Sequence, residues 1–348
     1  MSALNKTLQI RTSPHLTAGY SVDHIMRHVA WALLPTCGFA VFIFGLAALI
    51  TLIVASLTCV LTEHVLCKQS GKISSVNDYS ALVTGLLYGL TLPPGLPVWM
   101  VMVGAIIAIA LGKFMFGGLG CNIFNPALVG RAFLQAAFPS AMTSWGPAMA
   151  SERFSSVPSS LLAWPFQAPD YSSWADGVSS ATPLALMKFE QQLTQHADLL
   201  SGMTTGSYGE TCGVLILAGG TYLAIRKMLN WRIPLAIFVS AGTLSAICHY
   251  VSPELYPGAI FTLFSGGLML GAVFMATDMV ASPMTSKGVI VYGVLIGVLI
   301  VIIRNWGGLP EGVMYAILLA NAASPHIDAL TQPKVFGSQS KASSEGPE

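Results

Sequence analysis

Residues 42–66, "FIFGLAALITLIVASLTCVLTEHVL", form an apolar stretch in which the first charged residue is Glu63. A helix needs about 20 predominantly apolar residues to cross the hydrocarbon core of a bilayer. This stretch meets that requirement and predicts a transmembrane helix. We therefore expect the fold of the whole chain to be organised by a membrane rather than by a water-exposed surface.

The composition of the chain agrees with a membrane protein. The 348 residues are 54% hydrophobic and only 9% charged, and the mean hydropathy is +0.68. Soluble domains carry about 25% charged residues, so this chain has too few ionic groups to cover a globular surface. The net charge of +1 provides no field that would attract nucleic acid, and we expect no nucleic-acid partner.

The hydrophobic pattern predicts an all-α polytopic membrane protein with about ten transmembrane helices. The predicted segments are residues 24–40, 42–66, 79–93, 97–116, 124–138, 211–228, 233–250, 257–280, 287–304 and 310–325. Several of them are shorter than a full span and contain Gly or Pro. Broken helices are tolerated in a membrane only where protein or a cavity covers the freed backbone, and they often mark ligand sites.

The distribution of basic residues predicts the orientation of these helices. Cytoplasmic loops of membrane proteins carry an excess of Lys and Arg. With the N-terminus in the cytoplasm, 13 of the 16 basic residues fall on the cytoplasmic side, and only Arg153, Lys188 and Arg304 fall on the outer side. Both termini are then cytoplasmic. The long interval 139–210, which follows the fifth span, lies outside.

Short sequence matches suggest a duplicated unit of five spans. The matches are "GLLYGLT" (85–91) with "GAVFMAT" (271–277), "GGL" (117–119) with 307–309, and "SPH" (13–15) with 324–326. An odd number of spans per unit gives the two copies opposite orientations, the inverted-repeat architecture. Chance matching in a Gly-rich sequence is the alternative.

The predicted organisation has five parts. They are a cytoplasmic segment (1–23), a first five-helix repeat (24–138), the outer loop (139–210), a second five-helix repeat (211–325) and a cytoplasmic tail (326–348).

Two constellations in the predicted spans are candidates for binding. In "GGLGCNIFNPALVGRAFL" (117–134), Asn122 and Asn125 are three residues apart, and their carboxamides offer the donors and acceptors that a neutral heterocycle needs. The alternative, which composition favours, is a re-entrant turn in which the asparagines bond to the backbone. Asp278, in "FMATDMVASP" (274–283), is a carboxylate at the end of a span and a candidate for Na⁺ or proton movement. A headgroup position or a pair with Lys287 is its alternative.

The sequence contains few of the motifs that indicate a metal site or the catalytic site of a soluble enzyme. The six cysteines include no CxxC pair, so we predict no metal or iron–sulfur site. The chain lacks a Walker loop, GxGxxG, HExxH and GxSxG, which are the usual signatures of nucleotide binding and hydrolysis. We expect Glu63 and Asp78, near the ends of their spans, to be interfacial.

The outer loop contains "DGVSSATPLA" (176–185), a run of small residues around Thr182. A hydroxyl among small neighbours is expected to be sterically open. Such openness suits a modifying enzyme that lays a phosphorylated cofactor over the backbone. A Ser/Thr-rich loop without further role is the alternative.

The pattern Asp176-x-x-Ser179-Ser180-Ala181-Thr182 is similar to the target motif of the flavin transferase that links FMN to threonine. The chain also contains "DYSALVTGLLYGLTLPP" (78–94) together with the 117–134 and 274–283 stretches. With these motifs it resembles, from about residue 10 to 336, the D subunits of Rnf (or Rsx) electron transport complexes. Those proteins are homologous to the B subunit of the Na⁺-translocating NADH:quinone reductase. Ser180 departs from the motif, which usually has Gly there.

The resemblance implies a flavoprotein component of an ion-translocating oxidoreductase in the bacterial inner membrane. Thr182 would carry covalent FMN through a phosphoester on the periplasmic side, and it would exchange electrons with the flavin of the G subunit. The complex couples electron transfer between NADH and ferredoxin to Na⁺ or H⁺ translocation, and this chain has no complete catalytic site of its own. Further partners would be the A and E membrane subunits, the flavin transferase and the lipid bilayer.

The resemblance also assigns roles inside the membrane. It places Asn122 and Asn125 near a non-covalent riboflavin, and it links Asp278 to ion movement. A flavin-free secondary transporter or channel with inverted repeats is the competing function, because broken helices and repeats suit it equally well. A structural anchor for partner subunits is a third possibility.

Overall fold

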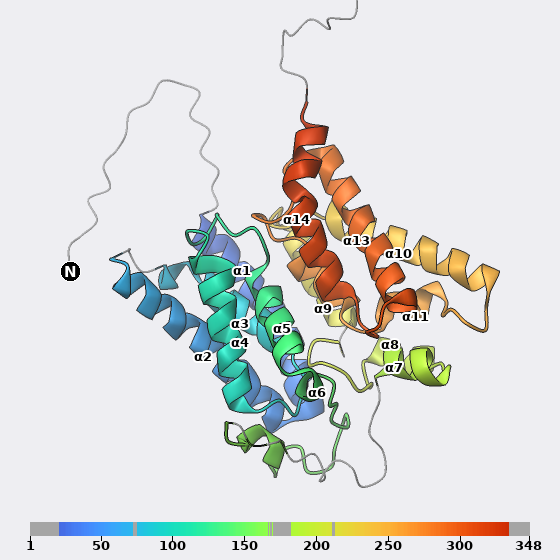
Figure 1. Ribbon diagram of the computed structural model, residues 1–348, viewed down its shortest axis with the longest axis horizontal. Coiled ribbons are helices and arrows are strands. Elements are labelled where there is room, and N and C mark those ends of the chain that lie inside the picture. The colour runs from blue at the N-terminus through green and yellow to red at the C-terminus, as the bar shows by residue number, and fades with distance from the viewer. Residues whose placement is uncertain are drawn as a thin grey trace, which may run out of the picture.

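The computed structural model describes residues 21–71, 75–165, 167, 169, 182–210 and 213–333, and within these residues it is helical without strands (Figure 1). A helix lies in each of the ten predicted segments. The prediction of an all-α protein is therefore confirmed for the described part of the chain.

The first half contains two long helices followed by three shorter main helices. Its elements are α1 Val22–Phe44, α2 Leu46–Gln69, α3 Ser80–Leu90, α4 Val98–Ile109 continued by the π-helical turn η2 Ala110–Phe114, α5 Pro126–Ala137 and α6 Pro139–Met142. The second half is built similarly but its third segment is broken. Its elements are α9 Gly213–Ile225, α10 Arg232–Val251, α11 Ala259–Phe264, α12 Leu268–Leu270 with the π-helical turn η6 Gly271–Met275, α13 Ser286–Trp306 and α14 Val313–Thr331.

Only some of these helices are long enough to cross a bilayer. Five described helices, α1, α2, α10, α13 and α14, have both the length and the hydropathy of a span. Shorter apolar helices are α3, the 98–114 helix and α9. The chain thus has the helices of a multi-pass membrane protein, whereas ten complete spans remain a prediction.

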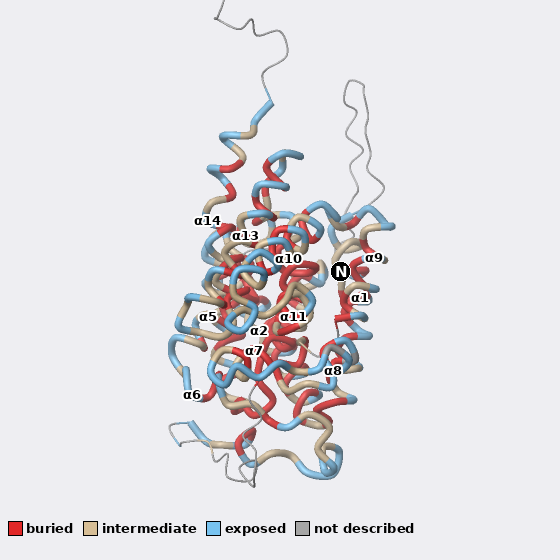
Figure 2. Tube along the Cα trace, turned by 90° about the vertical axis from the view of Figure 1, so that its right-hand side faces the viewer, coloured by how far each residue is buried: buried red, intermediate tan, exposed pale blue. Residues whose placement is uncertain are grey.

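The surface of α2 shows how a bilayer would cover this bundle. Leu49, Ile53, Leu57 and Leu61, which recur every four residues, are 41–55% exposed. Residues on the opposite face of the helix, such as Ala48, are buried in the core. Figure 2 shows the buried residues gathered inside the bundle and the exposed ones along its outside. An apolar stripe on the outside of an apolar core is the pattern of a helix that faces lipid rather than water.

The two halves pack in the same order of helices. In the first half α2 contacts α3 and α4, and α4 contacts α5; in the second half α10 contacts α11 and α13, and α13 contacts α14. The halves meet where α1 packs against α9 and α5 packs against α14 (Figure 1). This order is what a duplicated five-helix unit would produce, and the inverted orientation itself stays a prediction.

The contact between α10 and α13 depends on glycines. A Cβ on Gly297 would lie 2.8 Å from the carbonyl oxygen of Ile237 and 2.9 Å from the backbone nitrogen of Ala241. Gly293, four residues earlier, approaches α10 in the same way. Small residues spaced by four let membrane helices approach closely, so that van der Waals packing can hold them together.

The described helices of the 139–210 connection, which the charge count predicts to lie outside, are found at one end of the bundle (Figure 1). Among them are α6, α7 (Pro183–Ala185) with the π-helical turn η5 (Leu186–Glu190), and α8 (His196–Ser201). The C-terminal end of α14 points to the opposite end of the molecule (Figure 1).

All three basic residues that the charge count assigns to this outer end bind helix carbonyls. Arg153 Nε donates to Phe42 O near the end of α1 at 2.9 Å. Lys188 Nζ donates to the carbonyl oxygens of Arg304, Gly307 and Leu309, at and beyond the end of α13. Arg304 donates to two carbonyls at the end of α11, Thr262 O at 2.7 Å and Ser265 O at 2.9 Å. Cations at helix C-termini satisfy unpaired carbonyls and the helix dipole, so these three exceptions to the basic-residue bias have structural roles.

We predict that Gly297→Ala lowers the free energy of unfolding by ~1–3 kcal/mol, because the new methyl group meets backbone atoms that cannot rotate away. Thermal unfolding in detergent measures the effect. Gly38→Ala in α1 is the matched control, since a Cβ there meets nothing within 4 Å, and it is expected to cause no loss of stability. Equal midpoints for the two variants would contradict the close α10–α13 contact.

Candidate functional site

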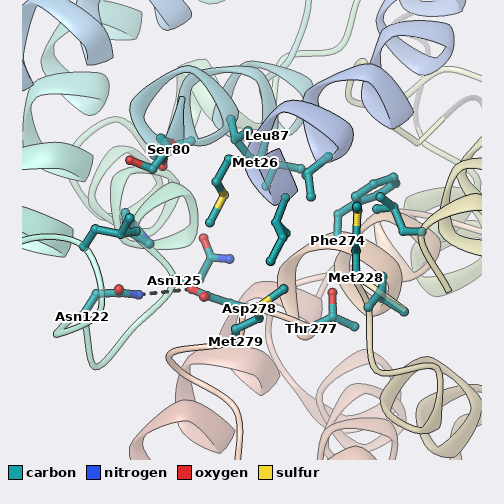
Figure 3. A pocket seen from close by; sticks show the side chains of 18 of the residues that line it. Met26, Ser80, Leu87, Asn122, Asn125, Met228, Phe274, Thr277, Asp278 and Met279 are labelled. Carbon is teal, nitrogen blue, oxygen red and sulfur yellow. Dashed lines mark hydrogen bonds between the residues drawn. The ribbon is translucent and has the colours of Figure 1, made fainter. Parts of the chain in front are cut away.

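A pocket opens between the two halves, beside the start of α1 and the end of α9 (Figure 3). The first half contributes residues from α1, α3 and the 119–126 segment, and the second half contributes residues from the end of α9 and from 274–279. The space encloses about 780 Å³, including its open mouth. Most of the lining is apolar, for example Met26, Leu87 and Phe274, and a few polar groups converge on it.

Asn125 links the two halves beside this pocket. Its Oδ1 accepts a hydrogen bond from the Ala127 N–H at 3.0 Å, which makes Asn125 the N-cap of α5, with Pro126 as the first helical residue. Its Nδ2 donates to Met275 O at the end of η6, at 3.1 Å. One buried side chain therefore starts a helix of the first half and pairs a carbonyl of the second half.

Asn122 reaches the second half in a similar way. Its Nδ2 donates to Phe124 O at 3.2 Å and to Asp278 Oδ2 at 3.1 Å, and Figure 3 shows the bond to Asp278 crossing the pocket wall. Asp278 Oδ1 accepts a further bond from the Val280 N–H at 3.1 Å. The structure thus brings together Asn122, Asn125 and Asp278, which the sequence presents as two separate constellations.

The structure bears on the turn interpretation of the asparagines, whereas the ligand interpretation stays a prediction. The turn interpretation is confirmed, because Asn125 caps α5 and Asn122 bonds to a backbone carbonyl. Their amides nevertheless keep capacity for a ligand, since only one of the two N–H donors of Asn125 has a partner and no described bond involves Oδ1 of Asn122. The alternative pair of Asp278 with Lys287 does not occur among the ion pairs of the described residues.

A buried ion pair next to the pocket was not expected from the sequence. Glu63 is 2% exposed, and its Oε1 lies 2.6 Å from Lys113 Nζ. Lys113 also donates to Ser80 Oγ at 2.6 Å, and both Lys113 and Ser80 line the pocket. Glu63, which the sequence predicts to be interfacial, is buried within the protein, because α2 packs on η2 and covers the carboxylate together with the ammonium. The available signal was Lys113 itself, the lone charge within the predicted fourth span.

Thr182 lies at the other end of the molecule and begins α7. Its Oγ1 accepts a hydrogen bond from the Ala185 N–H at 3.2 Å. Thr182 is 5% exposed, so the expectation of an open hydroxyl is wrong for this conformation, in which Pro183 and Leu184 are buried beside it. Asp176, Ser179, Ser180 and Ala181 lie outside the described residues.

A cleft of about 860 Å³ adjoins the segment that follows Thr182. Leu184, Met187 and Lys188 form one side, and the other side is formed by residues 255–257 after α10, by α11 and by the end of α13. The far side includes the rings of Tyr256 and Trp306, whose centroids are 5.6 Å apart. The cleft offers an aromatic wall together with cationic groups.

No group of three His, Cys, Asp or Glu residues suited to a metal ion occurs among the residues that the structure describes. The inner pocket and the Thr182 segment with its cleft are the two candidate ligand sites that the predicted residues line.

Comparison with known proteins gives the same assignment over almost the whole chain. The profile of the NQR2, RnfD, RnfE family matches residues 9–337. The D subunit of the proton-translocating ferredoxin:NAD⁺ oxidoreductase complex of Clostridium ljungdahlii is 40% identical over 95% of this chain and 96% of its own length. The D subunit of the Na⁺-translocating ferredoxin:NAD⁺ oxidoreductase complex of Acetobacterium woodii is 39% identical over 97% of both chains. The D subunit of the ion-translocating oxidoreductase complex of Stutzerimonas stutzeri is 38% identical over 91% of this chain and 92% of its own length.

We predict that Asn125→Ala lowers stability by ~1 kcal/mol more than Asn125→Ser does, because serine can restore the α5 cap but neither residue can reach Met275 O. Thermal unfolding of both variants measures the difference. Equal stabilities would show that the cap contributes nothing.

The buried pair gives a second prediction. Glu63→Gln leaves Lys113 charged and buried, and it should lower stability by ~3–5 kcal/mol. The double variant Glu63→Gln/Lys113→Met should recover part of that loss. Asp23→Asn, which breaks an exposed pair with Arg27 at 3.9 Å, is the control and should have no measurable effect. Additive losses in the double variant would contradict the buried pair.

Proposed function

The chain belongs to the NQR2, RnfD, RnfE family, and from this premise we propose that it is the membrane-embedded D subunit of an ion-translocating oxidoreductase complex. The proposed complex couples electron transfer between NADH and ferredoxin to Na⁺ or H⁺ translocation. The near-complete coverage of relatives that are named as subunits of such complexes is the observation that carries the proposal.

We further propose that Thr182 carries FMN through a phosphoester. The sequence around Thr182 supports this proposal, and so does the cleft of about 860 Å³ that begins two residues beyond it. Esterification would leave a lone pair on Oγ1, so the cap to the Ala185 N–H can persist. Attachment requires the buried hydroxyl to become accessible, and α7 is short enough, at three residues, to open at small cost.

At the Thr182 site, the proposed cofactor and the protein residues have different roles. FMN supplies one- and two-electron chemistry when it is bound. The protein residues supply position, with Tyr256 and Trp306 as an apolar wall and Lys188 as a fixed positive charge near the cleft. The electron partner in the proposal is the covalent flavin of the G subunit, and the membrane partners are the A and E subunits.

The inner pocket is proposed to bind non-covalent riboflavin. Its predominantly apolar lining suits a fused aromatic ring. The remaining N–H of Asn125 and the Oδ1 of Asn122 suit a ring edge that carries both a carbonyl and an N–H group. Asp278, beside them, is proposed to take part in the ion pathway.

The proposed placement is the bacterial inner membrane with cytoplasmic termini and a periplasmic 139–210 loop. Its support is the excess of basic residues on one side and the structural roles of Arg153, Lys188 and Arg304 on the other. The parallel order of helix contacts supports two inverted five-helix repeats.

A flavin-free transporter or channel remains the competing function. The broken segment α11–α12 and the pocket between the halves suit a transporter as well. The relatives favour the redox function, because their names describe oxidoreductase subunits.

We predict that the protein, co-expressed with its flavin transferase, gives a fluorescent band on a denaturing gel under ultraviolet light. Thr182→Ala should abolish the band because it removes the attachment oxygen, and Ser180→Gly should retain it. Thr194→Ala, a change on the same outer segment, is the control and should leave the fluorescence unchanged.

A wild-type band without fluorescence would contradict the proposed covalent attachment of FMN. If the complex still assembled in that case, the result would favour a structural anchor without its own cofactor. If the band of Thr182→Ala stayed fluorescent, the flavin would be attached elsewhere.

A further inference from the structure

Four charged side chains converge at the end of the bundle that carries Thr182. Arg131 comes from α5, Arg304 from the last turn of α13, Glu311 from the connection between α13 and α14, and Glu210 from the turn before α9. Arg131 and Arg304 are only 8% and 6% exposed. None of these groups lines the inner pocket, and only Arg304 also lines the cleft beside the Thr182 segment.

Glu311 is surrounded by donors that favour its ionised form. Its Oε2 lies 3.1 Å from Arg131 Nη2, and its Oε1 accepts a hydrogen bond from the Gly267 N–H at 2.6 Å. Burial alone would raise the pKa of Glu311, but the Arg131 charge and these hydrogen bonds outweigh it, so the pKa lies below its ordinary value. Glu311 is therefore the ionised member of the cluster.

Glu210 has different surroundings, although its carboxyl group hydrogen-bonds to that of Glu311. Its other described partner is a neutral hydroxyl, Ser207 Oγ, which donates to Oε1 at 2.7 Å. Two carboxyl groups can hydrogen-bond to each other only when one of them carries a proton. Burial, followed by the charge of Glu311, raises the pKa of Glu210 to about 8. These surroundings favour the proton on Glu210 rather than on Glu311.

We propose that Glu210 and Glu311 form a proton-binding site in which Glu210 holds one exchangeable proton and donates it in a hydrogen bond to the ionised Glu311. Release converts the Glu210 carboxyl group to a carboxylate and frees one proton. The proton can leave toward the outer solution past the Glu311 side chain, which is 16% exposed.

The charges around the pair select a proton rather than a metal cation. Arg131, Arg304 and Glu311 face Glu210, and in the protonated state two guanidinium groups stand against one carboxylate. The resulting net positive charge disfavours a metal ion. Lys188, the next cation, is held by carbonyl oxygens at the end of α13 and makes no described bond to either carboxyl group.

The site adjoins the Thr182 segment. A Cβ on Gly266 would lie 2.5 Å from Leu184 Cδ1, 3.0 Å from Arg304 Nη2 and 3.2 Å from Glu311 Oε1. Leu184, two residues after Thr182, is thus packed beside the cluster. Negative charge added at Thr182 would favour the protonated form of Glu210. This coupling rests on the proposed flavin at Thr182, whereas the proton site itself does not.

Infrared spectroscopy of the purified full chain tests the proton site. The wild-type protein should show a protonated carboxyl band that disappears as the pH rises through about 8. Glu210→Gln, which keeps the shape and a donor for Glu311, should lack the band, and Glu311→Gln should shift its disappearance to lower pH. Glu190→Gln, an exposed glutamate on η5, should match the wild type. If Glu210→Gln retained the band, or the wild type lacked it, the proposal would be overturned.

Redox titration of flavin-bearing protein tests the coupling. The flavin midpoint potential of the wild type should depend more steeply on pH than that of Glu210→Gln on the alkaline side of about 8. Identical pH dependences would overturn the coupling. Absence of any flavin adduct would overturn the proposed function instead, and it would leave the infrared result standing.

Discussion

A backbone carbonyl that lies inside a membrane must be paired, and this requirement governs the whole arrangement. Water is not available there, so an unpaired polar group costs several kcal/mol. Two helical segments that end within the bundle are completed by side chains from other elements. Arg304 binds the two carbonyls at the end of α11, and Asn125 binds Met275 O at the end of η6. The broken helices therefore depend on the side chains that pair their terminal carbonyls.

The same pairing creates both candidate sites. Because Asn122 and Asn125 reach from the first half to residues 275–278 of the second, the inner pocket forms at the junction of the halves. Because Lys188 binds the end of α13, the segment after Thr182 is fixed against the outer ends of the second-half helices. In the proposed function, these two sites hold the inner and the outer flavin of one chain. The Glu210–Glu311 pair then lies beside the proposed flavin at Thr182. A change in the charge of that flavin and a change in the protonation of Glu210 can therefore influence each other.

Much of the fold could be predicted from the sequence, because apolar segments and the positions of basic residues reflect the bilayer directly. A helix lies in every predicted segment. The number of full spans is harder to predict, because a helix break inside an apolar segment leaves its hydropathy unchanged. Gly266, with a φ of +64°, breaks the predicted 257–280 segment in this way. Side-chain contacts between residues far apart in the chain could not be predicted from the sequence. Glu63 meets Lys113 across 50 residues, and Asn122 meets Asp278 across 156. The burial of Thr182 could not be predicted from its small neighbours. Small neighbours leave a hydroxyl open only if the residues that follow do not pack over it, and here Leu184 packs against the protein.

The central claim is that this chain is a redox protein with one flavin bound covalently at its outer end. Mass spectrometry of the intact, denatured chain, produced together with the flavin transferase, tests that claim most directly. The account predicts a single mass increase equal to FMN minus one water, located by fragmentation at Thr182. An unmodified mass, or an adduct on another residue, would contradict it.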